Sequence, residues 1–308
     1  MYPLLLNTYT ASGEYVKPQM RRTSDEKTPE CLLLSGMDMG ESVVRNGEFA
    51  GLGLNEVLSR LGIRFEKTGD SFPVTVKLLN TDNRQPVKVY PDDEYALLHG
   101  GRAGKVSLLY VVDAEKDAEV VYGLSRNVSY DELQSRVQNA TLAAVCNFVS
   151  VQKGDVFFIP PGVVFSIGSG IVALEISTNS DTEYVISDYG RGGADGSSRL
   201  QVNHALEVMK TRKINIRYGN VGDITLYPFG TIRELGFCET FKSELITMDG
   251  NIGFYEDKNL ISVILASGEV DMSYPSGTMH LKAGNSVIVP CGVRARLSGK
   301  AEVIYTKF

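Results

Sequence analysis

A run of three carboxylates, Asp92, Asp93 and Glu94, is a candidate group for acid–base chemistry. The run follows Pro91, and acidic residues at such a place are typical of a turn and of the cap of a helix. We therefore expect a turn and cap rather than a catalytic group. Glu175 is a further carboxylate, and its place on a predicted strand, on the same face as Ile171 and Ala173, predicts that it points inward.

Histidine is the residue most often used for metal binding and proton transfer, and the chain has His99, His204 and His280. No two of them are spaced as ligands on one element, so the sequence predicts no histidine-rich zinc site. His99 stands beside Gly100 in a loop that we expect to be exposed. His204 lies next to the apolar stripe of a predicted helix, which favours a structural role, and His280 lies on a late strand.

Cysteines and glycines offer weaker candidates for chemistry. No Cys-x-x-Cys pair occurs, which predicts reduced and mostly buried thiols; the four cysteines are Cys31, Cys146, Cys238 and Cys291. The glycine-rich run at 190–198 could cradle a phosphate with its backbone amides. It follows no strand-to-helix turn of the P-loop type, so a flexible connector is the favoured interpretation.

Short strands separated by Gly, Pro, Asn and Asp must position these residues. Runs of β-branched and aromatic residues predict strands at 74–79, 87–90, 107–112, 119–123, 155–159 and 171–176. Apolar residues at helical spacing predict helices at 54–61 and from Val202 to near Arg212. Ser129 and Glu132 form a capping box, which predicts a third helix that ends near Gln138.

An internal repeat indicates the architecture. The pattern Gly-x5-Pro-x-Gly occurs at 154–162 and again at 284–292, and an apolar strand follows each copy. A hairpin-like stretch precedes the second copy, where Ser267 and Gly268 are expected to form the turn. Two related jelly-roll barrels explain the repeat. We therefore predict a mainly β fold with a few helices, a larger N-terminal domain at 1–222 and a smaller barrel at 223–308.

Charge and composition narrow the classes of partner. The 308 residues carry a formal net charge of −6, and Lys and Arg form no large cluster. Nucleic acid and anionic membranes are therefore not expected as partners. The chain starts without a basic leader, and its first apolar run is too short for a signal peptide or a membrane span. The default prediction is a cytoplasmic protein.

Several segments together resemble the short bacterial type of mannose-6-phosphate isomerase, a family of the cupin superfamily. In the family's order they cover most of 1–212; they are 1–4, 40–49, 72–77, 91–96, 104–105, 154–160, 179–182 and 188–191. The C-terminal part matches mainly through its jelly-roll pattern. The resemblance implies two cupin-type barrels, a sugar phosphate as substrate, and aldose–ketose isomerisation assisted by zinc.

The positions of the family's zinc ligands hold unrelated residues in this chain. Lys88 and Tyr90 stand where the family has Gln-x-His, Ser107 where it has the glutamate of Gly-Lys-x-Glu, and Phe165 where a histidine follows the Pro-x-Gly turn. A phenyl ring offers no lone pair, and an ammonium repels a metal ion. We therefore predict no metal and no other cofactor.

Two interpretations of Lys88 remain open. Lys88 and Tyr90 lie two residues apart on a strand, so both point inward in the family's geometry. The ammonium could then take the volume and part of the charge of the missing ion, within hydrogen-bond reach of Tyr90 or Ser107. Alternatively, Lys88 extends toward the barrel mouth and Tyr90 fills space.

Lys105 and Arg191 lie in segments that match the family and are the candidates for a catalytic role. Either can bind a phosphate or sugar hydroxyls, and arginine suits bidentate contact. The alternatives are that Arg191 pairs with Asp188 and that Lys105 is solvated. The predicted ligand-binding residues are Lys88, Tyr90, Lys105, Ser107, Phe165, Glu175 and Arg191.

Three functions are compatible with this pattern. The favoured one is a metal-free, catalytically inactive protein that binds a sugar or sugar phosphate, because unrelated residues at every ligand position indicate a metal site that has been lost. The second is an active mannose-6-phosphate/fructose-6-phosphate isomerase of carbohydrate metabolism in which Lys88 or Lys105 replaces the metal. The third is a scaffolding or regulatory protein that uses the exterior of the barrels.

Overall fold

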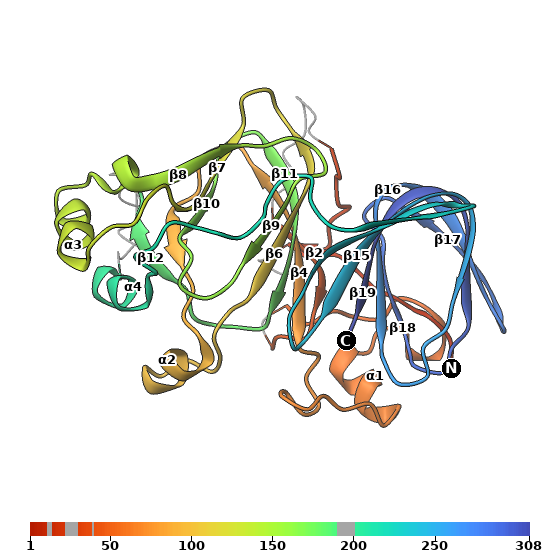
Figure 1. The fold of residues 1–308 in the computed structure, drawn as a ribbon. Coiled ribbons are helices and arrows are strands. Elements are labelled where there is room, and N and C mark those ends of the chain that lie inside the picture. Colours follow the sequence, from red (N-terminus) through yellow and green to blue (C-terminus); the bar gives the residue numbers. More distant parts are fainter. Residues whose placement is uncertain (11–13, 22–29, 39, 190–200) are drawn as a thin grey trace. The chain divides into compact units, whose positions relative to one another are not determined.

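The computed structural model describes residues 1–308 except 11–13, 22–29, 39 and 190–200 (Figure 1). The described residues form a mainly β fold with four α-helices, which confirms the predicted fold class. They make up two compact units: unit 1 comprises 1–79, 174–176 and 221–308, and unit 2 comprises 80–173 and 177–220. The predicted domains, 1–222 and 223–308, stay a prediction, because a compact unit need not be a folding domain.

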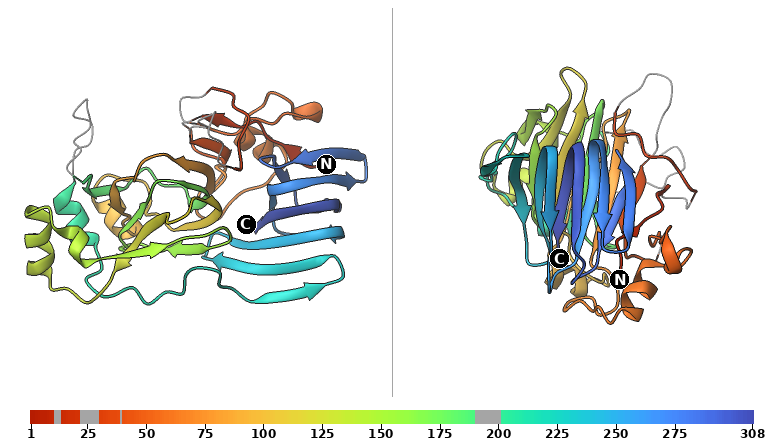
Figure 2. Two further views of the ribbon diagram at one scale, coloured as in Figure 1. Left: turned by 90° about the horizontal axis from the view of Figure 1, so that it is seen from above. Right: turned by 90° about the vertical axis from the view of Figure 1, so that its right-hand side faces the viewer.

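Unit 1 contains an eight-stranded antiparallel sheet, and Figure 2 shows its long strands side by side. The strand order is β1-β18-β16-β19-β15-β14-β13, with β17 beside β16. The strands are β1 (Leu4–Leu5), β13 (Ile224–Tyr227), β14 (Gly230–Phe237), β15 (Lys242–Phe254), β16 (Ile261–Tyr274), β17 (Gly277–Lys282), β18 (Ser286–Val289) and β19 (Ala295–Lys307). Alternating side chains such as Val263, Leu265, Leu297 and Val303 form a buried core on one face.

The N-terminal part of unit 1 adds three neighbouring strands and one helix. β3 (Cys31–Ser35) lies between β2 (Tyr9–Thr10) and β4 (Val74–Thr81). A short 3-10 turn, η1 (Gly47–Phe49), precedes helix α1 (Leu54–Arg60), which forms where the sequence predicts it. α1 buries Leu54, Val57 and Leu58, the apolar residues at helical spacing.

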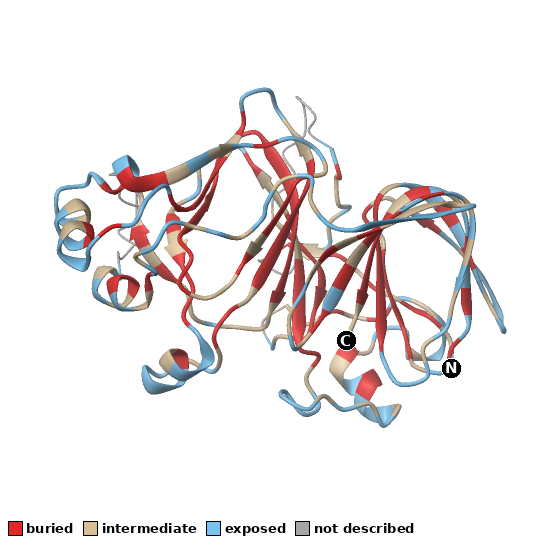
Figure 3. Ribbon diagram, in the orientation of Figure 1, coloured by how far each residue is buried: buried red, intermediate tan, exposed pale blue. Residues whose placement is uncertain are grey.

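Unit 2 is built on a five-stranded sheet with the order β12-β5-β10-β7-β8. Its strands are β5 (Val87–Val89), β7 (Glu119–Leu124), β8 (Cys146–Ser150), β10 (Phe165–Ile167) and β12 (Tyr184–Ser187). In a second sheet, β6 (Ser107–Ala114) lies between β9 (Val156–Ile159) and β11 (Ile171–Thr178). Residues 174–176 of β11 belong to unit 1, and the rest of this strand belongs to unit 2. Figure 3 shows that buried residues concentrate along the strands of each unit.

Helical segments cover one face of the five-stranded sheet. α3 (Tyr130–Gln138), η2 (Leu142–Val145) and α4 (Val202–Val208) bury Leu133, Val145 and Leu206 in one core with the sheet residues Val87 and Val89. The predicted cap of α3 is confirmed, since the hydroxyl of its N-cap serine accepts a hydrogen bond from a backbone amide three residues later.

Two helices differ from the prediction. α4 ends at Val208 rather than near Arg212, because Lys210 N–H donates to the carbonyl of Gly162 at 2.9 Å and draws the chain away from the helix. α2 (Asp93–Leu98) was not predicted as a helix. The predicted cap is confirmed, because the Asp92 carboxylate accepts a hydrogen bond from the amide of Tyr95 at 2.8 Å.

The sequence repeat is a structural repeat. Gly154 and Gly284 have φ of 91° and 85°, and Gly162 and Gly292 have φ of 83° and 78°, a region that favours glycine. β9 lies between Gly154 and Gly162 of the first copy, and β18 lies between Gly284 and Gly292 of the second. The backbone amide of Gly162 donates to the carbonyl of Tyr90 at 2.9 Å. The turn is therefore fixed to a segment that carries predicted site residues.

The turn predicted at Ser267 and Gly268 is wrong, because β16 continues through both residues. The register between β16 and β19 shifts at this place, and Gly268 has φ of 78°. A Cβ atom on Gly268 would lie 2.1 Å from the carbonyl oxygen of Lys300. The glycine marks a β-bulge in a long strand. The hairpin turn lies between Tyr274 and Gly277.

All four cysteines are unpaired, and two of them, Cys31 and Cys146, are buried. Burial raises the pKa of Cys146 to about 12, and burial together with the nearby Glu30 carboxylate raises the pKa of Cys31 to about 12. Both therefore stay as unreactive thiols at neutral pH. Cys238 and Cys291 are partly exposed, which the sequence did not predict.

No helix among the described residues is long and apolar enough to cross a membrane.

Candidate functional site

The interior face of the five-stranded sheet in unit 2 carries two of the predicted site residues. Phe165 in β10 pairs with Lys88 in β5 on one side and with Tyr122 in β7 on the other. Directly paired residues project from the same face of a sheet. Val89 and Val164 belong to the core beneath the helices. Their chain neighbours Lys88 and Phe165 therefore point away from the helices.

The β6–β9 pair faces this interior. The hydroxyl of Tyr122 donates to the carbonyl of Phe158 at 2.6 Å, and the ring of Tyr122 lies 5.2 Å from that of Phe157. Ser107 in β6 pairs with Ile159, which lies two residues after Phe157 and on the same face of β9. Ser107 is fully buried. It therefore points toward the same interior as Phe165 and Lys88.

Lys88 forms an ion pair with Glu183. The Lys88 ammonium lies 2.6 Å from the Glu183 carboxylate, with side-chain exposures of 29% and 42%. A hydrogen bond from this ammonium to Tyr90 or Ser107 would let it replace a metal ion. The structure shows a hydrogen bond to Glu183 instead. The half-exposed pair instead supports the alternative that Lys88 extends toward solvent.

We expect Glu183→Gln to lower the free energy of unfolding by less than about 1 kcal/mol, because a half-exposed ion pair contributes little. Chemical denaturation of the wild type, Glu183→Gln, Lys88→Met and the double variant gives the coupling energy of the pair. A coupling energy above about 2 kcal/mol would contradict this, since it would place the pair in a dry interior.

Lys105 is buried against Tyr90. The exposed fractions of the two residues are 9% and 5%, and the Lys105 ammonium lies 4.5 Å from the centre of the Tyr90 ring. A cation at this distance over the ring face is attracted by the quadrupole of the ring. The alternative that Lys105 is solvated is therefore wrong. Tyr90, which holds a ligand position of the family, instead packs beneath a cation.

Backbone packing holds Lys105 in place. The amide of Gly104 donates to the Asp93 carboxylate at 2.8 Å, and the amide of Lys105 donates to the carbonyl of Pro91 at 3.1 Å. A Cβ atom on Gly104 would lie 2.3 Å from the carbonyl carbon of Asp92. Only glycine allows this contact without a shift of the backbone. The acidic run thus caps α2, as the turn-and-cap interpretation predicts, and its Asp93 also holds the Gly-Lys segment, which was not predicted.

The residues at the family's four ligand positions do not fit zinc. Zinc in proteins takes imidazole, thiolate or carboxylate ligands. These four positions supply an ammonium, a phenol, a hydroxyl and a phenyl ring, from Lys88, Tyr90, Ser107 and Phe165. The phenyl ring has no donor atom, and the two oxygen donors are neutral. The second cation nearby, Lys105, further disfavours a metal ion.

For two predicted site residues, a place in the interior of unit 2 stays a prediction. Glu175 is buried on β11 and counts with unit 1, so its inward orientation stays a prediction. Arg191 and the glycine-rich run at 190–198 lie outside the described residues. Their roles in phosphate binding remain predictions from the sequence.

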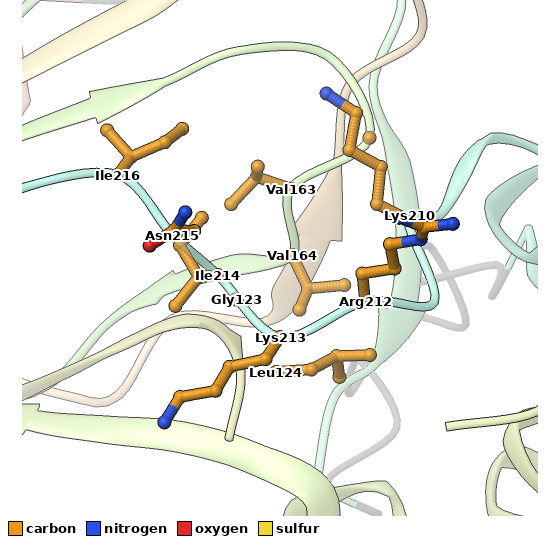
Figure 4. A pocket seen from close by; sticks show the side chains of 11 residues that line it. Gly123, Leu124, Val163, Val164, Lys210, Arg212, Lys213, Ile214, Asn215 and Ile216 are labelled. Carbon is orange, nitrogen blue, oxygen red and sulfur yellow. The ribbon is translucent and has the colours of Figure 1, made fainter. Parts of the chain in front are cut away.

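None of the predicted site residues that the structure describes lines either of two pockets at the surface. The pocket in unit 2 has a volume of about 190 Å³ and lies near Lys210 and Arg212. Figure 4 shows apolar side chains such as Val164 at its centre, with the Lys213 side chain pointing away from them. A larger hollow of about 590 Å³ in unit 1 is lined by loop residues.

Sequence reasoning missed a group of potential metal ligands in unit 2. His99 follows α2, whereas His204 and Glu207 lie one turn apart on α4. One ligand atom from each of the three side chains lies within 4.8 Å of those from the other two. The spacing of His204 and Glu207 was a signal in the sequence, but the third member comes from a distant segment that only the fold brings close.

Solved structures first define the class of fold. The crystal structure of mannose 6-phosphate isomerase from Bacillus subtilis aligns with a TM-score of 0.84 and 24% identity over 99% of both chains. A variant of phosphomannose isomerase from Salmonella typhimurium aligns with a TM-score of 0.73 and 9% identity, again over 99% of both chains. The fold is therefore that of the cupin-type mannose-6-phosphate isomerases.

Sequence comparison then gives the family. No protein-family model matches the chain. Mannose-6-phosphate isomerase ManA of Bacillus subtilis is 31% identical over 91% of this chain and 89% of its own length. Mannose-6-phosphate isomerase of Streptococcus mutans is 33% identical over 61% of this chain and 60% of its own length. The chain belongs to the mannose-6-phosphate isomerase family, as its sequence motifs predict.

Proposed function

We propose that this chain binds a sugar phosphate, or the corresponding sugar, in the interior of unit 2 without zinc and without isomerase turnover. The observation that carries the proposal is the set of side chains at the four ligand positions, of which Phe165 is buried and has no donor atom. The names of the relatives in Bacillus subtilis and Streptococcus mutans supply the ligand class, mannose 6-phosphate.

The replaced ligands are the reason to expect no turnover. Aldose–ketose isomerisation moves a proton between C1 and C2 through an enediol, and negative charge develops on the substrate oxygen. A Lewis acid at that oxygen contributes several kcal/mol to the transition state, and each 1.36 kcal/mol changes the rate tenfold. The neutral hydroxyls of Tyr90 and Ser107 stabilise such a charge less than a divalent ion does.

The charges at the interior support an anionic ligand. Lys105 is buried and has its ammonium over an aromatic ring rather than in bulk water. A phosphate dianion interacts strongly with such a partly dehydrated cation. We therefore propose Lys105 as the residue that binds the phosphate or a sugar hydroxyl.

An isomerase assay with mannose 6-phosphate, in the presence of either zinc chloride or EDTA, tests the proposal. The ManA relative from Bacillus subtilis is the positive control. We expect no turnover above the background with either addition. Turnover at ordinary enzymatic rates, about 1–1,000 s⁻¹, would favour an active isomerase with a lysine in the metal's role.

Removal of the Lys105 charge should weaken binding of mannose 6-phosphate by about 10- to 100-fold, because a hydrogen bond to a charged group contributes about 1.5–3 kcal/mol. Lys105→Met keeps the apolar stem and removes the ammonium. Isothermal titration calorimetry with mannose 6-phosphate, mannose and inorganic phosphate then separates the contributions of the phosphate and the sugar.

Lys116→Met is the matched control, since Lys116 is an exposed lysine of the same unit, in the turn between β6 and β7. We expect its affinity to equal that of the wild type. Equal binding by both variants would reject Lys105 as the anion-binding residue. If the wild-type protein binds none of the three ligands, the binding function itself is rejected and a scaffolding role is favoured.

A further inference from the structure

We propose that His99, His204 and Glu207 form a binding site for a divalent transition-metal ion, with Zn²⁺ as the expected occupant. The three residues lie at the surface of unit 2, on α4 and at the end of α2. This place differs from the family's ligand positions, which face the interior on the other side of the sheet. The inference is therefore independent of the proposed function.

The ligand atoms already lie close together. Zinc binds nitrogen and carboxylate oxygen at about 2.0–2.2 Å, so tetrahedral ligands lie about 3.4 Å apart. The three ligand atoms lie within 4.8 Å of one another. Glu207 is exposed, so rotation about its side-chain bonds can bring a carboxylate oxygen toward the two imidazoles. Two imidazoles and one carboxylate are a known ligand set for zinc and leave one position open.

Tyr95 fixes the tautomer of His99. The Nδ1 atom of His99 lies 2.8 Å from the backbone carbonyl oxygen of Tyr95. A carbonyl can only accept, so His99 must carry its proton on Nδ1 and donate it. The neutral ring then has its lone pair on Nε2, which is the arrangement found in most metal-bound histidines.

The hydroxyl of Tyr95 fixes the tautomer of His204 in the same way. It lies 2.5 Å from a carboxylate oxygen of Glu207 and 2.9 Å from Nδ1 of His204. The ionised carboxylate can only accept, so the single hydroxyl proton goes to Glu207. His204 must therefore donate its Nδ1 proton to the hydroxyl oxygen. Its Nε2 lone pair and the second oxygen of Glu207 take no part in these two hydrogen bonds and are available to a metal ion.

Aromatic packing holds both imidazole rings in place. The ring of His99 stacks on that of Tyr95 at 3.9 Å between centroids, and the ring of His204 stacks on that of Tyr184 at 5.1 Å. Rings held in this way lose less conformational freedom when they bind an ion.

A bound ion would join α2 to α4. Because the ion binds the folded chain, it raises the apparent stability in proportion to the logarithm of its concentration. The three ligands carry one negative charge in total, so the site favours a cation. Nitrogen ligands favour zinc, copper and nickel over magnesium and calcium.

The test is calorimetric titration of the EDTA-treated full-length protein with zinc chloride, with magnesium chloride as the negative control. We expect one zinc ion per chain for the wild type and no binding of magnesium. His204→Ala should weaken zinc binding at least about 100-fold, and Tyr95→Phe about 10- to 100-fold, since partners that orient a ligand are worth that much.

His280→Ala is the matched control, because His280 is also exposed and contacts a carboxylate, that of Asp271 at 2.9 Å. Its zinc affinity should equal that of the wild type. Circular dichroism spectra should show that all variants remain folded. Absence of zinc binding by the wild type, or unchanged binding in folded His99→Ala and His204→Ala, would overturn the proposal.

Discussion

Restoring the family's four ligands should produce a zinc site in the interior of unit 2. The changes are Lys88→Gln, Tyr90→His, Ser107→Glu and Phe165→His, made in a His204→Ala background so that the surface group does not contribute. We expect zinc affinity at least about 1,000-fold above that of the unrestored background, because structural zinc sites contribute about 10–16 kcal/mol in small domains. Calorimetric titration with zinc chloride measures the change.

The strand register is the reason for this expectation. Phe165 pairs with Lys88 across two strands, and Ser107 faces the same interior from the opposing pair. Without metal, the restored chain should be several kcal/mol less stable than its parent, because a buried carboxylate and buried imidazoles lack partners. Zinc should then raise its melting temperature, whereas magnesium should not.

A triple variant that keeps Phe165 is the control for the restored site. It lacks one of the four ligands and should bind zinc at least about 100-fold more weakly, more than the loss of an outer-shell partner costs. If the folded fourfold variant gained no zinc affinity, the four positions would not form one ligand set, and the resemblance would have misplaced them.

Gly104→Ala should cost about 3 kcal/mol or more and abolish binding of mannose 6-phosphate. The added Cβ would lie 2.3 Å from the carbonyl carbon of Asp92 and 2.6 Å from the amide nitrogen of Asp93. Both are backbone atoms, so neither can rotate away, and overpacking against a rigid neighbour costs about 1–3 kcal/mol or more. Lys105 would move with its neighbour.

Gly100→Ala is the matched control for this change. Gly100 has φ of 83°, but a Cβ atom there would meet nothing within 4 Å. Its cost is therefore limited to backbone strain, about 1–2 kcal/mol, and ligand binding should survive. Chemical denaturation and calorimetry compare the two variants. An equal or smaller effect of Gly104→Ala would contradict the packing described for the Gly-Lys segment.

Regular elements could be predicted where local signals agree. The capping box at Ser129 and the apolar spacing from Leu54 both predicted helices that the structure contains. α2 was missed because it is only six residues long and leaves Leu97 and Leu98 exposed, so it has little apolar periodicity. Gly268 was misassigned because a glycine of positive φ serves a turn and a bulge equally well.

The site could be predicted only in part, because its contacts join segments that are distant in the sequence. The family's motifs identified Lys105 and Tyr90, but not that the ammonium lies over the ring. That contact depends on backbone packing around Gly104, which no residue pattern specifies. Likewise, His99 meets His204 only because the fold brings the ends of two helices together.

The repeated turn also bears on how such a chain can evolve. Backbone hydrogen bonds hold the turn in both copies. The amide of Gly162 donates to the backbone carbonyl of Tyr90 at 2.9 Å, and the amide of Gly292 donates to the backbone carbonyl of Glu256 at 2.7 Å. The third residue after the last glycine is Phe165 in the first copy but Ala295 in the second. The backbone hydrogen bonds of the turn do not involve that side chain, so its replacement leaves them in place. A lineage can therefore lose or gain a ligand at this position in one substitution while the protein continues to fold.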